Sequence, residues 1–192
     1  MNLHRSGMVL SALLLATPAT AQVTWSSTDK GPGVVLSNGN LDAAGSDAFH
    51  MTRATLGRSS GKHCFELGVV SADGAASVVS GIANASATLT TYPGASAASA
   101  GVQWMAVAVS QPYVSTGIAR ANGFTVPVTS VTGDTLSVCV DFAAGAAWWG
   151  RNGTWFGNPA TGTAPAVTGI TGTWFPAIAP YNAANKLRLK AT

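Results

Sequence analysis

The stretch that decides the fold opens GDTLSVCVDFAAGAAWWGRNGTWFGNP at residues 133–159 and ends GTWFPAIAP at residues 172–180. Every second residue of its first run is apolar: Leu136, Val138, Val140 and Phe142. A period of two is typical of a β-strand with one buried face. Ala144-Gly145 and Asn152-Gly153 end the first two runs, and Asn-Gly is the strongest short hairpin signal. The stretch therefore predicts a β-meander.

Motifs in this stretch resemble those of the SPRY domain, particularly its compact bacterial and phage versions. In chain order they are Gly133-Asp134, Val140-Asp141, Trp149, Asn152-Gly153 and Phe175-Pro176. Two upstream pieces also fit, Arg53–Thr55 with Ser59–Lys62 and the strand His63–Leu67. The similarity extends from about Leu36 to Leu189. It departs at Cys64, where the family usually has an aromatic residue, and at Ala87–Gly101, which matches nothing. The resemblance implies a concanavalin-like jelly roll.

Patterning along the rest of the chain favours the same all-β class. The 192 residues include 22 glycines, only 9% are charged, and no internal window has a clean helical stripe. Alternating runs between turn signals predict two antiparallel sheets packed as a β-sandwich. The expected strands are 49–55, 62–71, 77–84, 102–109, 134–142, 145–151, 173–180 and 185–190. Parity places Phe65, Leu67, Val138, Val140, Trp149 and Ile178 in the core between the sheets.

The first 21 residues have the pattern of a secretory signal peptide. Arg5 precedes an apolar run over residues 8–16, and Ala19-Thr20-Ala21 fits the small-x-small cleavage rule. The run is too short to span a bilayer comfortably, so we expect no membrane span after cleavage. The expected organisation is a signal peptide at 1–21 and one SPRY-like domain at 22–192, secreted or periplasmic. A retained anchor, a misassigned start codon and a virion location are the alternatives.

The two cysteines leave a disulfide open. Parity turns both Cys64 and Cys139 away from the core, so they meet only if their strands are neighbours in one sheet. A bond closing so long a loop would contribute about 4 kcal/mol in the chain-entropy model. Two free, partly covered thiols are the favoured interpretation.

The chain lacks the residue patterns of the common enzymes. Glu66 is the only glutamate and has no acid two or four positions away, so the carboxylate pair of a concanavalin-like glycoside hydrolase is missing. Asp134 stands where an aspartate caps a turn, and Asp141 is expected to hydrogen-bond neighbouring loop backbone, so both have structural roles. His50 and His63 have no partners at metal-ligand spacing, and no nucleotide fingerprint occurs. We expect no catalysis, no metal and no cofactor.

The charge pattern argues against a nucleic-acid partner. The formal net charge is only +3. Its one basic cluster, Lys186, Arg188 and Lys190, lies on one face of a final strand, which favours a solvated or blunted edge.

What remains is recognition of a protein or a glycan through loops of the sandwich. The candidate ligand-binding residues are Tyr92, Tyr113, Arg120 and Trp148, because aromatic and arginine side chains dominate binding hot spots. A covering loop over Trp148, and loop anchoring by the two tyrosines, are the alternatives. A secreted, non-catalytic binding module is the favoured function. A phage or virion structural component is the alternative, and a glycoside hydrolase is disfavoured.

Overall fold

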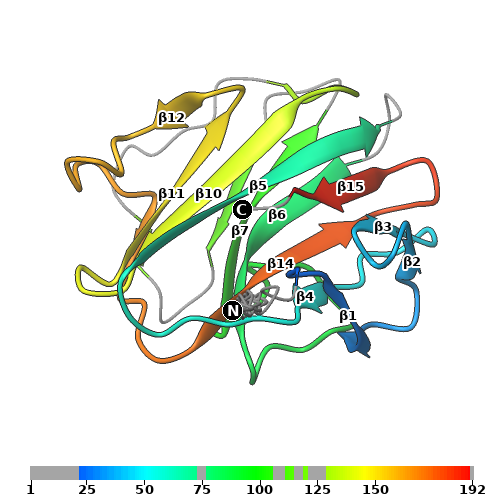
Figure 1. Cartoon of the computed structure of the whole chain (residues 1–192), viewed down its shortest axis with the longest axis horizontal. Coiled ribbons are helices and arrows are strands. Elements are labelled where there is room, and N and C mark those ends of the chain that lie inside the picture. Colours follow the sequence, from blue (N-terminus) through cyan, green and yellow to red (C-terminus); the bar gives the residue numbers. More distant parts are fainter. Residues whose placement is uncertain (1–21, 73–76, 106–110, 115–118, 121–128, 191–192) are drawn as a thin grey trace, which may run out of the picture.

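Two antiparallel β-sheets pack face to face in the computed structural model, which describes residues 22–72, 77–105, 111–114, 119–120 and 129–190. No helix occurs within these ranges, and none therefore is long and apolar enough to cross a membrane. Figure 1 shows the long strands β5, β10 and β11 in one layer and β6 and β7 in the other. The expected all-β sandwich is confirmed.

In the six-stranded sheet the three longest strands are neighbours, and shorter strands flank them on both sides. Its strands, in spatial order, are β1 (Trp25–Lys30), β4 (Thr52–Ala54), β14 (Trp174–Pro180), β6 (Ser77–Asn84), β7 (Ser99–Met105) and β8 (Gln111–Val114).

The nine-stranded sheet contains the predicted meander. Its strands, in spatial order, are β2 (Val35–Ser37), β3 (Asp42–Ala44), β15 (Lys186–Leu189), β5 (Lys62–Ser71), β10 (Thr135–Asp141), β11 (Ala146–Arg151), β13 (Val167–Thr168) and β9 (Ala119–Arg120). β12 (Thr154–Phe156) pairs with β11 beside this path.

Each of the eight predicted strands corresponds to an observed one. They match β4, β5, β6, β7, β10, β11, β14 and β15. The strand expected at 102–109 is β7, which starts earlier, at Ser99, and whose last four expected positions lie outside the described residues. The sequence prediction missed β1, β2, β3, β8, β9, β12 and β13, which are two to six residues long.

The core between the sheets has the predicted composition. Phe65, Leu67, Val138, Val140, Trp149 and Ile178 are all buried in it. Two buried indoles also find acceptors on β6: Trp149 Nε1 donates to the Ser80 carbonyl at 3.1 Å, and Trp104 Nε1 donates to Ser80 Oγ at 2.7 Å. These bonds remove the cost of burying the two indole N–H groups, and the Trp149 bond also links the two sheets.

Turn chemistry explains the meander. Asn152 and Gly153 both have positive φ, 50° and 79°, as the hairpin turn that follows strand twist requires. Asp141 Oδ1 accepts hydrogen bonds from the amides of Ala143 and Ala144 at 3.0 and 3.1 Å. The Ala144 amide, together with the neighbouring lysine Lys62, holds the pKa of Asp141 below its ordinary value.

Asp134 closes the turn before β10 in a similar way. It accepts the Val131 amide at 2.7 Å and a two-pronged contact from Arg151 at 2.7 and 3.1 Å. Burial raises its pKa, but hydrogen bonds from Arg151, Val131 and Asn152 outweigh burial and leave the pKa lowered. The structural roles expected for Asp134 and Asp141 are confirmed.

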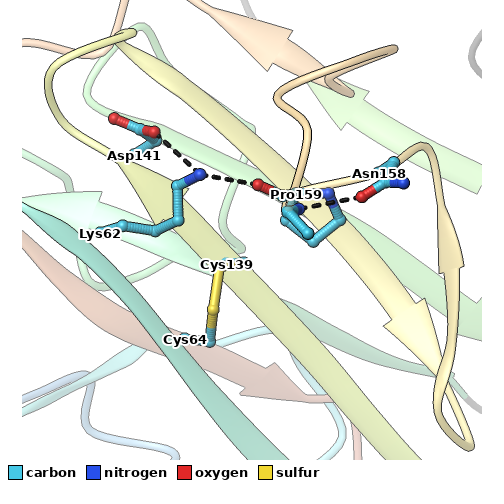
Figure 2. The surroundings of a disulfide bond; sticks show 7 residues. Lys62, Cys64, Cys139, Asp141, Asn158 and Pro159 are labelled. Atoms are coloured by element: carbon cyan, nitrogen blue, oxygen red, sulfur yellow. Dashed lines mark hydrogen bonds and ion pairs between the residues drawn. A yellow bond between two sulfur atoms is a disulfide. The ribbon is translucent and has the colours of Figure 1, made fainter.

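The structure contains the disulfide that the sequence interpretation disfavoured. Cys64 of β5 and Cys139 of β10 are direct cross-strand neighbours, with Cα atoms 4.0 Å apart, and their sulfur atoms are bonded (Figure 2). The parity prediction was correct, since both side chains leave the core. The expectation of free thiols was wrong because β5 and β10, far apart in sequence, pair side by side. Cys64 is exposed, whereas Cys139 is fully buried.

The outer face of the six-stranded sheet is covered by the loop at 85–98. Gly81 and Gly101 make room for it, because a Cβ atom on Gly101 would lie 2.6 Å from the Pro93 carbonyl. Met51, Ala83, Ala87 and Ala177 form a second small core there, against which Leu89 packs. Much of the Ala- and Ser-rich run that matched no motif therefore forms a loop that covers the small side chains on the outer face of this sheet.

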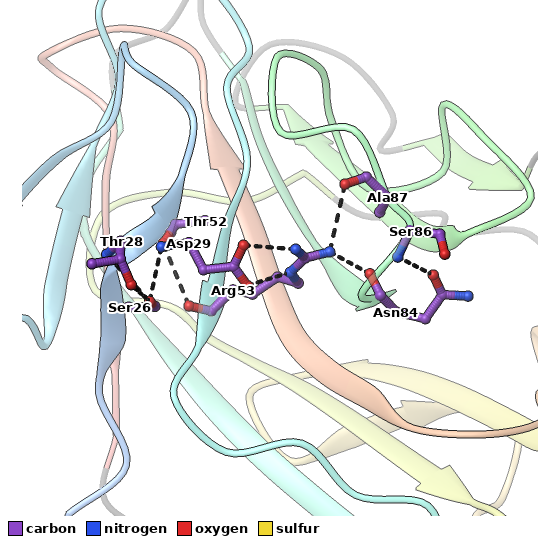
Figure 3. Close-up of polar contacts among 8 residues, drawn as sticks. All are labelled: Ser26, Thr28, Asp29, Thr52, Arg53, Asn84, Ser86 and Ala87. Carbon is purple, nitrogen blue, oxygen red and sulfur yellow. Dashed lines mark hydrogen bonds and ion pairs between the residues drawn. The ribbon is translucent and has the colours of Figure 1, made fainter.

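A buried arginine ties this cover to the edge of the sheet (Figure 3). Arg53 of β4 donates from Nε and Nη2 to the two carboxylate oxygens of Asp29, each at 2.6 Å. Its Nη1 donates to the carbonyls of Asn84 and Ala87. Since Arg53 is only 5% exposed, this pairing keeps a buried charge satisfied and fixes β1, β4 and the turn after β6 together.

Candidate functional site

A groove opens at one end of the sandwich, where β14 begins and β10 and β15 end. Its volume is about 100 Å³. Apolar and aromatic side chains make up most of its walls: Val23, Leu56, Phe65, Ile82, Val140, Phe142, Trp174, Phe175, Pro176 and Leu189. Both sheets contribute, so the groove is the open end of the core rather than a dent in one sheet.

A short bulge forms one rim of this groove. After β4, the Thr55 amide donates to the Thr24 carbonyl at 2.8 Å. Three residues later, Arg58 and Trp174 form two backbone hydrogen bonds of 2.8 Å with each other. Leu56, 39% exposed, projects between these two anchor points. Gly57 has no space for a side chain, since a Cβ atom would lie 2.7 Å from the Phe175 ring.

The aromatic walls are held in place from outside the groove. The Arg53 guanidinium lies 5.9 Å from the centre of the Phe175 ring, and this contact attaches the ring to the buried ion pair of Figure 3. Trp174 Nε1 donates to the Thr171 carbonyl at 2.8 Å. Fixed side chains lose little conformational entropy on binding, so these walls are preorganised for a ligand.

Three basic residues line the groove, but they differ in availability. The Lys190 ammonium donates to Thr135 Oγ1 at 2.6 Å and lies 3.7 Å from the Glu66 carboxylate. His63 Nε2 lies 3.0 Å from the Ser60 carbonyl, and its ring packs 6.4 Å from that of Phe142. Arg58 is exposed, and its guanidinium forms no hydrogen bond or ion pair with any residue that the structure describes.

Carboxylates do not line the groove in the described part of the chain. Five of the seven acids are paired with cations: Asp29 with Arg53, Asp42 with Arg188, Asp134 with Arg151, Asp141 with Lys62 and Glu66 with Lys190. Of these five cations, Lys190 alone lines the groove. Across the same residues no group of three His, Cys, Asp or Glu side chains could hold a metal ion. The groove therefore offers apolar surface and positive charge to a ligand.

Tyr92, one of the four predicted binding residues, belongs to a cluster of three rings at loop positions. Phe49 packs edge-on against Tyr92 at 5.3 Å and against Tyr181 at 5.1 Å. The three rings come from the loops after β3, β6 and β14, and Tyr181 is 39% exposed. This aromatic cluster is separate from the groove lining.

Tyr113 and Arg120 lie on strands at the outer edges of different sheets. Tyr113 of β8 pairs with Gly101 in the six-stranded sheet, and Arg120 of β9 pairs with Val167 in the nine-stranded sheet. The four predicted residues are thus distributed over both sheets, and Arg120 shares a ladder with Val167 and with Ala147, the neighbour of Trp148.

The prediction that the Trp148 side chain faces a ligand is wrong. It faces away from the core, as its parity indicates, but it is 0% exposed. The loop at 157–164 covers it, and Trp148 Nε1 donates to the Thr163 carbonyl at 2.9 Å. Lys62 secures the same loop by donating to the Pro159 carbonyl at 2.7 Å (Figure 2). A buried anchor of this kind is not available to a ligand.

The sequence prediction missed Leu56, Arg58 and Phe142 as groove residues. Leu56 and Arg58 lie between the strands expected at 49–55 and 62–71, and the backbone pairing of Arg58 with Trp174 places them beside β14. Phe175-Pro176 was the one usable signal, since that motif marks the strand that forms a groove wall.

Comparison with known proteins identifies the fold. No model of a known protein family matches the sequence, and neither does any curated protein. The SPRY domain of human HERC1 superposes with a TM-score of 0.62 at 14% identity, covering 88% of this chain and 98% of that domain. The PSpry domain of TRIM65 gives 0.63 at 15% identity, covering 90% and 93%. A human SPRY domain gives 0.54 at 11% identity, covering 82% and 94%. The chain has the fold of SPRY domains.

Proposed function

We propose that this chain, which has the SPRY fold, is a non-catalytic module that binds an exposed segment of a partner protein in the groove between Leu56 and Trp174. SPRY domains are generally protein-interaction modules, and the fold supports the same role here. One observation carries the proposal: an open apolar groove with fixed aromatic walls at the end of the sandwich.

The size of the groove favours a peptide over a small-molecule ligand. Sites for drug-sized ligands enclose roughly 300–1,000 Å³. The groove holds about 100 Å³, which suits one apolar side chain. Burying such a side chain contributes about 1.5–3 kcal/mol, a magnitude typical of a single hot spot in a protein interface.

Photo-crosslinking tests this proposal. A benzoylphenylalanine at position 56 should capture a discrete partner from the secreted or periplasmic fraction. The matched control places it at position 35, because Val35 is also an exposed apolar residue, at 59%, but lies on β2 outside the groove lining. Equal labelling from both positions would refute binding at the groove.

The proposal includes secretion, which rests on the pattern of residues 1–21. Mass spectrometry of the protein purified from the extracytoplasmic fraction should find a chain that begins at Gln22. Recovery of the full-length chain from the cytoplasm, or from purified virions, would support the alternative of a virion component.

Glycan binding is a second candidate, favoured by the cluster of Phe49, Tyr92 and Tyr181. Partly exposed aromatic rings on neighbouring loops suit stacking against sugars. A polysaccharide screen with the parent and Tyr181→Ala separates the two candidates, because glycan binding should depend on Tyr181 and not on Leu56.

A further inference from the structure

We infer that the segment bound in the groove has an apolar side chain beside an aspartate or glutamate, whose carboxylate pairs with Arg58. The inference rests on the proposed function and names the chemistry of its partner. The apolar side chain enters between Leu56, Phe142 and Trp174, and the acidic one remains at the rim.

Charge complementarity supports a carboxylate at this rim. Arg58 is exposed, and its guanidinium has no partner among the described residues and lies beside apolar walls. The other arginines whose side chains are described on strands, Arg53, Arg151 and Arg188, each hold an aspartate in a two-pronged contact. A guanidinium matches a carboxylate in this geometry better than any other common protein group, and Arg58 has this capacity unused.

The other groups that line the groove also favour a negatively charged ligand. The described lining contains no carboxylate that could compete for Arg58 or repel an acidic ligand. Lys190 already contacts Glu66 and Thr135, so part of its charge is offset by a neighbouring carboxylate. His63 keeps one ring nitrogen, Nδ1, outside its contact with Ser60. A neutral or basic segment would leave the Arg58 guanidinium beside apolar surface without a counter-charge.

Peptide selection provides an unbiased test. A random twelve-residue library displayed on phage is selected against the immobilised chain 22–192, and the recovered peptides are resynthesised with acetyl and amide caps. The caps remove terminal charges, so any carboxylate that matters must belong to a side chain. We expect recovered peptides to share an acidic residue next to an aromatic or aliphatic one.

Two variants with matched controls locate the contacts. Arg58→Gln should weaken binding of the capped peptides roughly two- to fivefold, since an ion pair at a solvent-exposed rim contributes about that factor. Lys186→Gln removes an equal charge from β15 outside the groove and should leave affinity unchanged. Leu56→Asp should abolish binding, whereas Val35→Asp should not. All four sites are on the surface, and denaturation curves matching the parent would confirm folding.

The outcomes separate the inference from the proposed function. Loss of binding in Leu56→Asp with full affinity in Arg58→Gln, or recovered peptides without acidic residues, overturns the inference and leaves the groove in place. If neither Leu56→Asp nor Arg58→Gln changes the affinity, or if the selection recovers no peptide whose binding depends on the groove, the inference and the proposed function are both overturned. Replacing the acidic residue of a recovered peptide by its amide should reproduce the Arg58→Gln loss, and no additional loss should appear when both changes are combined.

Discussion

Removal of the disulfide between Cys64 and Cys139 should destabilise the sandwich by about 4 kcal/mol. The bonded cysteines are 75 residues apart in sequence. In the chain-entropy model a cross-link over that distance lowers the entropy of the unfolded chain by about 15 cal/mol/K, or about 4 kcal/mol at room temperature. For a domain of this size the melting temperature should fall by roughly 10 °C.

The assay is chemical denaturation of the Cys64→Ala, Cys139→Ala double variant beside the parent. Alanine is preferable at 139 because that side chain is fully buried and a serine hydroxyl there would need a partner. The parent measured with a thiol reductant should move toward the double variant, and the reductant should leave the double variant unchanged.

Two results would refute this reasoning. The first is quantitative labelling of two free thiols in the native protein purified under oxidising conditions. The second is a double variant whose free energy of unfolding lies within about 0.5 kcal/mol of the parent, the range of a neutral surface change.

Three further predictions concern packing and charge. Trp149→Ala should lower the free energy of unfolding by about 3–5 kcal/mol, and Val140→Ala by less, in denaturant titrations; parent-like midpoints would contradict their burial. Gly101→Val should displace the loop that covers it and cost about 1–3 kcal/mol, which limited proteolysis of that loop would reveal; an unchanged cleavage pattern would argue against the cover. The pKa values of Asp42 and Asp134 are lowered in the folded protein, that of Asp42 chiefly by a hydrogen bond from Arg188. Both carboxylates therefore stabilise the fold at pH values above the unfolded-state pKa of about 3.8, and this stabilisation is lost as the pH falls through the lower folded-state pKa. Acid unfolding followed by tryptophan fluorescence should therefore begin below about pH 4 and become less steep in Asp→Asn variants.

The long strands could be predicted from the sequence because their signals are local. In β5 and β10 apolar residues alternate, and the Asn152-Gly153 turn has the φ values its residue types favour. The short strands have no such signal. β3 has three residues and is defined by its pairing with β15, where Asp42 meets Arg188 across 146 residues of sequence.

The candidate site was less predictable because it is made of long-range neighbours. The alternation of side chains correctly predicted that Cys64 and Cys139 point away from the core, but it could not predict that their strands pair. Parity also turned Trp148 outward correctly, yet a loop from elsewhere in the meander covers it. The groove residues come from several strand ends, and no pattern within one segment distinguishes Arg58 from an ordinary solvated arginine.

Val23 and Lys190, near the two ends of the described chain, both line the groove. A tag fused next to Val23 or Lys190 would therefore be attached beside the groove proposed to bind a partner. A tethered segment is present there at an effective concentration in the millimolar range when its linker is short and flexible. An affinity tag with acidic and aromatic residues at either end would compete with a weak ligand, so binding measurements require tag-free protein.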